Sequence, residues 1–205
     1  MRIVHPQVGE VSFEDLRRFI CEGKKNGWAS GKKPINFTDG SEGYKHVEGN
    51  LFYRDNYIGE GNFMGQEVVY FINGLPTRNI PLWGMSYSDS FKLPTDFPSD
   101  QAKPFEKEVM NFLKDCLMQV PEDFPFRGPN DQVIREVMGR ELVYVNTPMA
   151  LREHPSSNYI GGDFIFRGFH GFETIFMEPG NKNGSEIFNL VYHGRLLVPE
   201  AYVRD

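Results

Sequence analysis

The sequence predicts an α+β fold made of two pseudo-symmetric halves, each a helix followed by an antiparallel meander. The main observation is a strand-rich stretch that occurs twice, over residues 49–70 and again over residues 162–176, each time followed by a further apolar run. The second observation is that a helical pattern precedes each copy. Helices that are segregated from antiparallel strands are typical of α+β proteins and not of parallel βαβ sheets.

Both copies carry the same polar positions within apolar strand sequence. A Gly-x-Glu motif contains Glu67 in the first copy and Glu173 in the second, and a tyrosine follows 20 and 19 residues later, at Tyr87 and Tyr192. A chain of 205 residues is long enough for one generous domain or two small ones. Because each half alone is small, we expect a single domain over residues 1–205 in which the halves share one core.

The first half is expected to span about residues 12–90. Ser12 is a suitable N-cap for a helix over about 13–22, whose apolar residues recur at helical spacing. Gly23 then supplies a stop signal. The half therefore begins with an amphipathic helix.

A long loop over residues 24–43 separates this helix from the first meander. Long loops in compact domains are often functional, and Trp28 within this one is either a core anchor or part of a lid over a pocket. Strand composition and turn signals predict strands at residues 44–48, 50–57, 66–72 and 82–87.

The second half is expected to span about residues 104–198. Pro104 suits the first position of a helix, and the apolar residues from Phe105 to Val120 form a continuous helical stripe. Cys116 lies on this stripe, so we interpret it as a core residue and not as a nucleophile. After a proline-punctuated turn at 121–129, strands are expected at 141–146, 163–167, 171–177 and 187–193, with a loop at 147–157.

Composition and charge narrow the function. The 18 Phe and 9 Tyr predict an aromatic-filled core, with an aromatic-lined ligand pocket as the alternative. A net charge of −6 without a long basic run argues against nucleic-acid binding, which depends on Lys and Arg at the phosphates. The lysine doublets at 24–25 and 32–33 are interpreted as parts of a solvated loop.

Targeting signals and metal motifs are missing from the sequence. The N-terminal residues contain no apolar signal-peptide core, and no apolar run approaches the length that spans a bilayer. Cys21 and Cys116 have neither metal-site spacing nor a CxxC arrangement. We therefore expect a soluble, cytoplasmic protein with reduced thiols, no membrane partner, no cofactor and no metal.

Several short motifs resemble a family of uncharacterised bacterial proteins that is defined only as a domain of unknown function. They are Glu48-Gly49, Tyr53-Arg54-Asp55, Gly65–Val69, Trp83–Tyr87, Gly162-Asp163-Phe164, Phe169, Gly171, Glu173 and Tyr192-His193-Gly194. The likeness covers most of residues 13–195 and departs in the loops at 73–80 and 147–157. Some members carry a helix-turn-helix segment, which implies a regulatory or sensing role, but residues 1–12 are too few for one.

The repeated glutamates are the first candidates for chemistry. Burial of Glu67 or Glu173 would raise the pKa of its carboxyl group unless a cation compensates, and perturbed carboxylates cluster at functional sites. Arg54 and Arg167 hold matching places in the two copies and are the expected partners. Each Arg–Glu pair is either a cross-strand ion pair or part of a ligand site.

A ligand-binding or regulatory module is the leading hypothesis, with an aromatic cleft between the two halves as the binding site. Ligand pockets combine apolar walls with a few polar groups. The walls are expected to be Tyr53, Trp83, Tyr87, Phe166, Tyr192 and His193, with Glu67 and Glu173 as polar anchors.

Two other functions stay open at this point. One is an unfamiliar hydrolase that uses Glu173 with His170 or His193 as its acid–base pair; the sequence contains no G-x-S-x-G, HExxH or P-loop motif. The other is a protein-interaction module whose strand edge pairs with a partner or with a second copy, which leaves a homo-oligomer as one alternative. Because only the second copy carries histidines and Arg195, we expect a site kept in one half to lie there.

Overall fold

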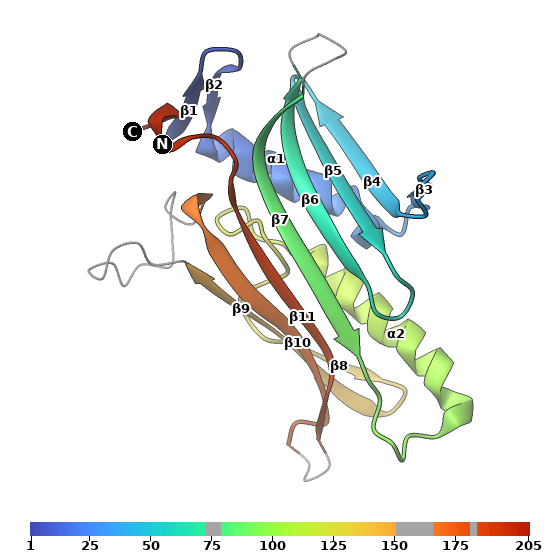
Figure 1. Ribbon diagram of the computed structural model, residues 1–205. Coiled ribbons are helices and arrows are strands. Elements are labelled where there is room, and N and C mark those ends of the chain that lie inside the picture. Colours follow the sequence, from blue (N-terminus) through green and yellow to red (C-terminus); the bar gives the residue numbers. More distant parts are fainter. Residues whose placement is uncertain (73–78, 151–165, 181–183) are drawn as a thin grey trace.

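The computed structural model describes residues 1–72, 79–150, 166–180 and 184–205. Over these residues a nine-stranded antiparallel sheet carries two α-helices on one face, so the predicted α+β class is confirmed (Figure 1). The elements of the large sheet and its helices are α1 (Phe13–Lys25), β3 (Ile35–Asn36), β4 (Glu42–Glu48), β5 (Leu51–Ile58), β6 (Met64–Ile72), β7 (Asn79–Phe91), α2 (Ser99–Leu117), β8 (Val133–Val137), β9 (Arg140–Ala150), β10 (Phe169–Met177) and β11 (Ser185–Leu196).

The strand order is β3-β4-β5-β6-β7-β11-β10-β9-β8. Consecutive strands therefore form one meander up to β7 and a second from β8 to β11, and the two meet where β7 pairs antiparallel with β11. In this central pairing Tyr87 lies opposite Tyr192. A small separate sheet joins β1 (Arg2–His5), β2 (Gly9–Ser12) and β12 (Val203–Arg204).

Helix α1 begins as predicted but ends later. The Ser12 side chain accepts a hydrogen bond from the backbone N–H of Asp15 (3.0 Å), which caps the first turn. Gly23, the expected stop, is inside the helix instead, because its lack of a side chain makes room for the ring of Tyr53. A Cβ at Gly23 would lie 2.5 Å from Tyr53 Cγ. Lys24 is consequently on the buried face of α1 and not in a solvated loop.

Helix α2 begins at Ser99, so the prediction that Pro104 occupies the first helical position is wrong. Pro104 lies inside the helix, where proline cannot donate the backbone hydrogen bond to the preceding turn. The predicted stripe is nevertheless buried, including Phe105 and Cys116 at 0% exposure, which confirms Cys116 as a core residue.

The second meander differs from the prediction in its first two strands, β8 and β9. β8 was not expected, and β9 continues to Ala150 through what the sequence predicts as loop. The strand expected at 163–167 is not found where the structure describes that range: Phe166 and Arg167 form a helical turn, and 163–165 lie outside the described residues. Of the expanded loops at 73–80 and 147–157, residues 73–78 and 151–157 also fall outside the described residues, while 79–80 belong to β7 and 147–150 to β9.

Aromatic rings fill the space between the sheet and the helices, as the composition predicts. Trp83 at the centre of β7 is fully buried, and its ring lies 5.8 Å from that of Phe126, which in turn stacks on Phe169 at 3.7 Å. In the part of the chain that the structure describes, no helix has the length and apolar character to cross a membrane.

Candidate functional site

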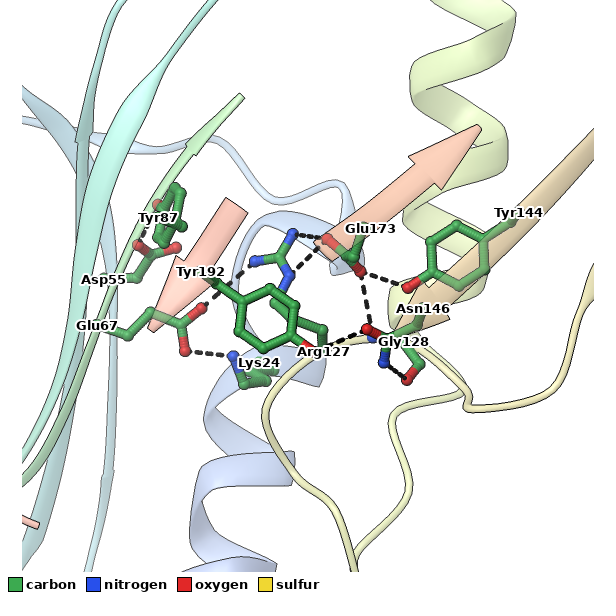
Figure 2. Close-up of polar contacts among 10 residues, drawn as sticks. All are labelled: Lys24, Asp55, Glu67, Tyr87, Arg127, Gly128, Tyr144, Asn146, Glu173 and Tyr192. Atoms are coloured by element: carbon green, nitrogen blue, oxygen red, sulfur yellow. Dashed lines mark hydrogen bonds and ion pairs between the residues drawn. The ribbon is translucent and has the colours of Figure 1, made fainter. Parts of the chain in front are cut away.

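A network of buried charged residues lies on the helix-covered face of the sheet (Figure 2). Its two carboxylates are those the repeat predicts: Glu67 on β6 is 3% exposed and Glu173 on β10 is 0% exposed. Both are inward-facing positions of their strands, each two residues after a glycine. Burial of two carboxylates is costly unless cations and hydrogen-bond donors neutralise them.

Glu67 is neutralised by two cations from outside the sheet. Lys24 on α1 donates a hydrogen bond from Nζ to Glu67 Oε2, and Arg127 approaches Glu67 Oε1 with its Nη1 at 3.7 Å. Burial lowers the pKa of Lys24 even though Glu67 opposes the shift. Glu67 is therefore the main contact that favours the charged form of the largely buried Lys24 side chain.

Glu173 is the most fully satisfied acid in the network. Arg127 donates from Nε and from Nη2 to Glu173 Oε2, both at 2.6 Å, a side-on arrangement that suits guanidinium. Glu173 Oε1 accepts from the hydroxyl of Tyr144 and from the backbone N–H of Gly128 (3.3 Å). The carboxylate is thereby enclosed by donors on both oxygens.

Arg127 links the two carboxylates. It lies in the segment after α2, and its side chain reaches Glu173 on one side and Glu67 on the other. Burial would lower the pKa of Arg127, but the two carboxylates more than offset it and raise the pKa above its usual value. The guanidinium is permanently charged and joins strands β6 and β10.

The sequence-based partners of the glutamates are wrong. In the ladder Arg54 is opposite Val68, so strand alternation puts Arg54 and Glu67 on different faces. Arg54 donates to Asn56 Oδ1 (2.6 Å), and Arg167 forms an ion pair with Glu200 (2.9 Å). The cations come from a helix and a loop because those elements cover the inner face.

Asp55 is a third buried acid, one strand away from Glu67 and paired with it in the ladder. Its Oδ1 accepts a hydrogen bond from the Tyr87 hydroxyl at 2.6 Å. Burial, together with the neighbouring charge of Glu67, raises the pKa of Asp55 to about 7. Among the described residues no ion pair includes Asp55, which distinguishes it from both glutamates.

The second meander contains a closely similar set of contacts. The Tyr192 hydroxyl donates to Asn146 Oδ1 at 2.8 Å, as Tyr87 donates to Asp55. Asn146 is opposite Glu173 in the ladder, as Asp55 is opposite Glu67. The main chemical difference is that a neutral amide replaces the carboxylate.

A glycine makes each tyrosine contact feasible. Gly65 is opposite Tyr87 and Gly171 is opposite Tyr192, and the tyrosine ring lies across the glycine in both pairs. A Cβ on either glycine would overlap the phenol. The rings therefore cross the neighbouring strand and reach the acid or amide beyond it.

A cavity of about 60 Å³ adjoins the first of these two sets. Its polar wall is Lys24, Asp55, Glu67 and Arg127. The other lining residues are mostly aromatic or apolar: Trp28, Ala29, Tyr53, Tyr57, Phe63, Tyr87, Leu113 and Leu117. Trp28 is only half-buried, packs against the core and lines the cavity, so it combines the two roles that the sequence leaves open.

The predicted aromatic walls are divided between the cavity and the core. Tyr53 and Tyr87 line the cavity beside Glu67. Trp83 stacks within the core, and Phe166 packs against the ring of Phe13 at 5.1 Å. Tyr192 belongs to the closed set around Asn146. The cavity therefore lies beside the first copy, whereas the sequence points to the second.

The structure does not bring the predicted acid–base pair together. His170 and Glu173 are three residues apart on β10, and the ladder is regular between them, so their side chains point to opposite faces. His193 is opposite His170 and is exposed on the uncovered face, where it lines a groove. Glu173 and either histidine therefore cannot act on a common substrate atom. The acid–base pair on which the hydrolase hypothesis depends is not formed.

Three site residues were missed by sequence reasoning. Lys24 is four residues after Ile20, on the apolar stripe of α1, and this position was the available signal. Asp55 follows Tyr53 at the same spacing as Asn146 follows Tyr144, a likeness hidden by the longer insertion before Glu173. No pattern in the sequence around Arg127 marks it as a site residue.

One further cluster has the composition of a metal site. Ligand atoms of Glu22, His46 and Glu48 lie within 4.8 Å of one another. Arg18 donates to Glu48 at 2.9 Å and to Glu22 at 3.1 Å, so a guanidinium already neutralises this group. The cluster is explained as an ion-pair network at the surface of α1.

Comparison with known proteins adds one finding. Neither the curated proteins nor the solved structures contain a match to this chain. A family model described as a domain of unknown function (DUF5680) matches residues 55–146. The match begins at Asp55 and ends at Asn146, the two corresponding residues of the buried networks, and its family has no described activity. The chain is thus similar, over this central part, to an uncharacterised domain family.

Proposed function

We propose that this protein is a small-molecule-binding module with a regulatory role, and that its ligand occupies the cavity beside Asp55 and Glu67. One observation carries the proposal: the aromatic cavity ends on buried acids, one of which has no cationic partner among the described residues. Charged groups that are buried in this way are costly and need a compensating contact. A ligand would supply it.

Binding is favoured over catalysis by the chemistry of the lining. The residues around the cavity include no Ser, Cys or His within the described part of the chain. Lys24 and Glu67 are engaged with each other, so neither is free to transfer a proton to a substrate. Asp55 is the one carboxylate of the wall outside an ion pair among the described residues, and a lining without a Ser, Cys or His nucleophile supports recognition better than turnover.

We also infer that the chain consists of two related halves, at about residues 12–90 and 104–198. The matching contacts support this inference: Tyr87 with Asp55 in one half, and Tyr192 with Asn146 in the other. In the second half, Arg127, Tyr144 and the backbone of Gly128 together saturate Glu173. On this basis one half has kept a binding site and the other stabilises the fold.

The test is a fragment screen that uses Trp28 as the reporter. The indole N–H of Trp28 is followed by NMR in the ¹⁵N-labelled protein while small neutral, cationic and anionic fragments are added. We expect some fragments to shift the Trp28 signal and to raise Tm in the wild type. In an Ala29→Phe variant, whose new ring fills the cavity, the same fragments should have no effect.

A second alanine, at an exposed position, provides the matched control for the Ala29→Phe variant. Ala201→Phe adds the same ring at an exposed position and should bind fragments as the wild type does. Fragments that bind equally to Ala29→Phe, or a screen without any binder, would overturn the proposed site.

A further inference from the structure

The charges around the cavity do not balance when Asp55 is ionised. Lys24 and Arg127 supply two positive charges, and Glu67 and Glu173 take up both of them in ion pairs. Asp55 then leaves one negative charge in a buried environment, 7% exposed, with only the Tyr87 hydroxyl as a described hydrogen-bond donor. A proton or an external cation would restore neutrality.

Three aromatic rings, those of Tyr57, Phe63 and Tyr87, line the cavity together with Asp55. The ring centroids of Tyr57 and Phe63 are 6.3 Å apart with planes at 63°, and those of Phe63 and Tyr87 are 6.1 Å apart at 79°. Each pair meets edge to face, so the rings that line the cavity are differently oriented, and the π-face of an aromatic ring attracts a cation placed over it. Quaternary and other organic ammonium ions are recognised by such aromatic walls.

We propose that the cavity selects a small organic cation, an alkyl-substituted ammonium ion, with Asp55 as its counter-ion and the rings of Tyr57 and Phe63 as its walls. This inference rests on the proposed function and adds the chemical class of the ligand. Its positive charge neutralises the carboxylate of Asp55, and its alkyl groups contact the rings.

Other ligand classes fit the cavity less well. An anion would add a second uncompensated negative charge, because Lys24 and Arg127 are already paired. A metal ion such as Mg²⁺ or Ca²⁺ requires six or more oxygen ligands, whereas the rings offer none. The cavity volume of about 60 Å³ is several times the roughly 10–15 Å³ that a single water needs, so the space admits a ligand larger than one water.

The second half provides an internal comparison. Asn146 takes the place of Asp55 there, and its Oδ1 accepts from Tyr192 in the same way. The amide keeps the hydrogen bond and removes the charge. Asp55→Asn is therefore a conservative variant that the fold already tolerates at the corresponding position.

Proton and ligand should compete for Asp55. The titratable and charged groups that face it are Glu67, Tyr87, Lys24, Arg127, Tyr53 and Tyr44. Burial, followed by the charge of Glu67, raises the pKa of Asp55 to about 7. Below that pH a proton neutralises the carboxyl group, and above it the site is open to a cation. Affinity for the cation should increase between pH 6 and pH 8.

The experiment compares choline with its neutral isostere 3,3-dimethylbutan-1-ol, by calorimetric titration of the full chain at pH 8. We expect choline to bind the wild type at least about tenfold more tightly than the neutral alcohol, because a desolvated charge pair and the ring faces act on the cation alone. Asp55→Asn should abolish that preference while its circular dichroism and Tm show an intact fold.

The matched control is Asp123→Asn, which removes the same charge from an exposed position outside the cavity and should leave choline binding unchanged. Equal binding of the two probes to the wild type, or an Asp55→Asn variant that still prefers choline, would overturn the cation assignment and leave the binding site intact. If neither probe binds, the cation assignment also falls. The fragment screen then shows whether the cavity binds a ligand of any other class.

Discussion

Arg127 is the residue on which the two halves of the buried network depend. It carries a permanent charge, it is 6% exposed, and it is shared between Glu67 and Glu173. Removal of one partner from a buried ion pair leaves the other charge uncompensated, which costs more than the pair contributes as a whole. Arg127 is thus a stability determinant as well as a wall of the cavity.

Arg127→Met should lower the free energy of unfolding by about 3–5 kcal/mol, because Glu173 then keeps a buried charge without its guanidinium. Urea denaturation at pH 7 measures the change. The matched control is Arg54→Met, at the position that the sequence favours as a glutamate partner but that lies on the other face. Its cost should stay below about 1 kcal/mol. Equal costs for the two variants would contradict the role of Arg127.

Asp55 makes stability depend on pH in the direction opposite to an ordinary salt-bridged acid. Its pKa is raised to about 7 in the folded protein, so between about pH 4 and pH 7 the folded state binds more protons than the unfolded state. The contribution is present in full below pH 4 and is lost as pH rises through 7. Asp55→Asn should remove this dependence and be more stable than the wild type at pH 8, as measured by Tm.

Comparison of Tm at pH 5 and pH 8 separates the effect from a general change in stability. At pH 5 the wild type is protonated at Asp55, and the difference from Asp55→Asn should shrink. A constant difference at both values would show that Asp55 does not titrate near neutrality.

Among the elements, α1 and α2 show what sequence patterns capture. The apolar stripes predict both helices and the face that each one buries. They do not predict where α1 ends, because Gly23 is required for contact with Tyr53 and not for a turn. They misplace the start of α2 since Pro104 is tolerated inside it.

Pro104→Ala should raise the free energy of unfolding by about 1–3 kcal/mol, because it restores the missing backbone hydrogen bond and relieves the clash of the ring with the preceding turn. Pro104 is exposed, so no core contact is lost. Chemical denaturation measures the gain, with Lys103→Ala as an exposed neighbour that should change stability by less than about 0.5 kcal/mol. A loss of stability would show that the proline fixes the direction of the first turn.

For the strands, local sequence patterns predict less of the site than they predict of the helices. The Gly-x-Glu motifs single out the acids of β6 and β10, and the structure adds that both face inward, which the sequence leaves open. The sequence cannot show that Lys24 and Arg127 reach those acids, because both arrive from elements far away along the chain. Likewise, strand alternation separates His170 from Glu173 only once the regular ladder is known.

At the scale of the whole molecule, the two meanders are joined by one continuous sheet and by the network around Arg127. β7 pairs with β11 from Trp83 to Phe91, and Arg127, from the segment after α2, lines the cavity beside Glu67 of β6. We therefore expect one cooperative thermal transition, with a calorimetric enthalpy equal to the van't Hoff enthalpy. Two resolved transitions would indicate halves that fold independently.

The crossing of tyrosine over glycine has a consequence for the detection of distant relatives. A glycine that lies under a phenol cannot be exchanged without displacing the ring from its acceptor, whereas the surrounding apolar residues can be exchanged for others of similar volume. The order Tyr-x-Asp or Tyr-x-Asn, then Gly-x-Glu, then Tyr is a spacing pattern set by contact geometry. Such a pattern should remain detectable in chains with little overall sequence similarity to this one. Asp or Asn at its third position would then distinguish a cavity lined by a buried carboxyl group from one lined by a neutral amide.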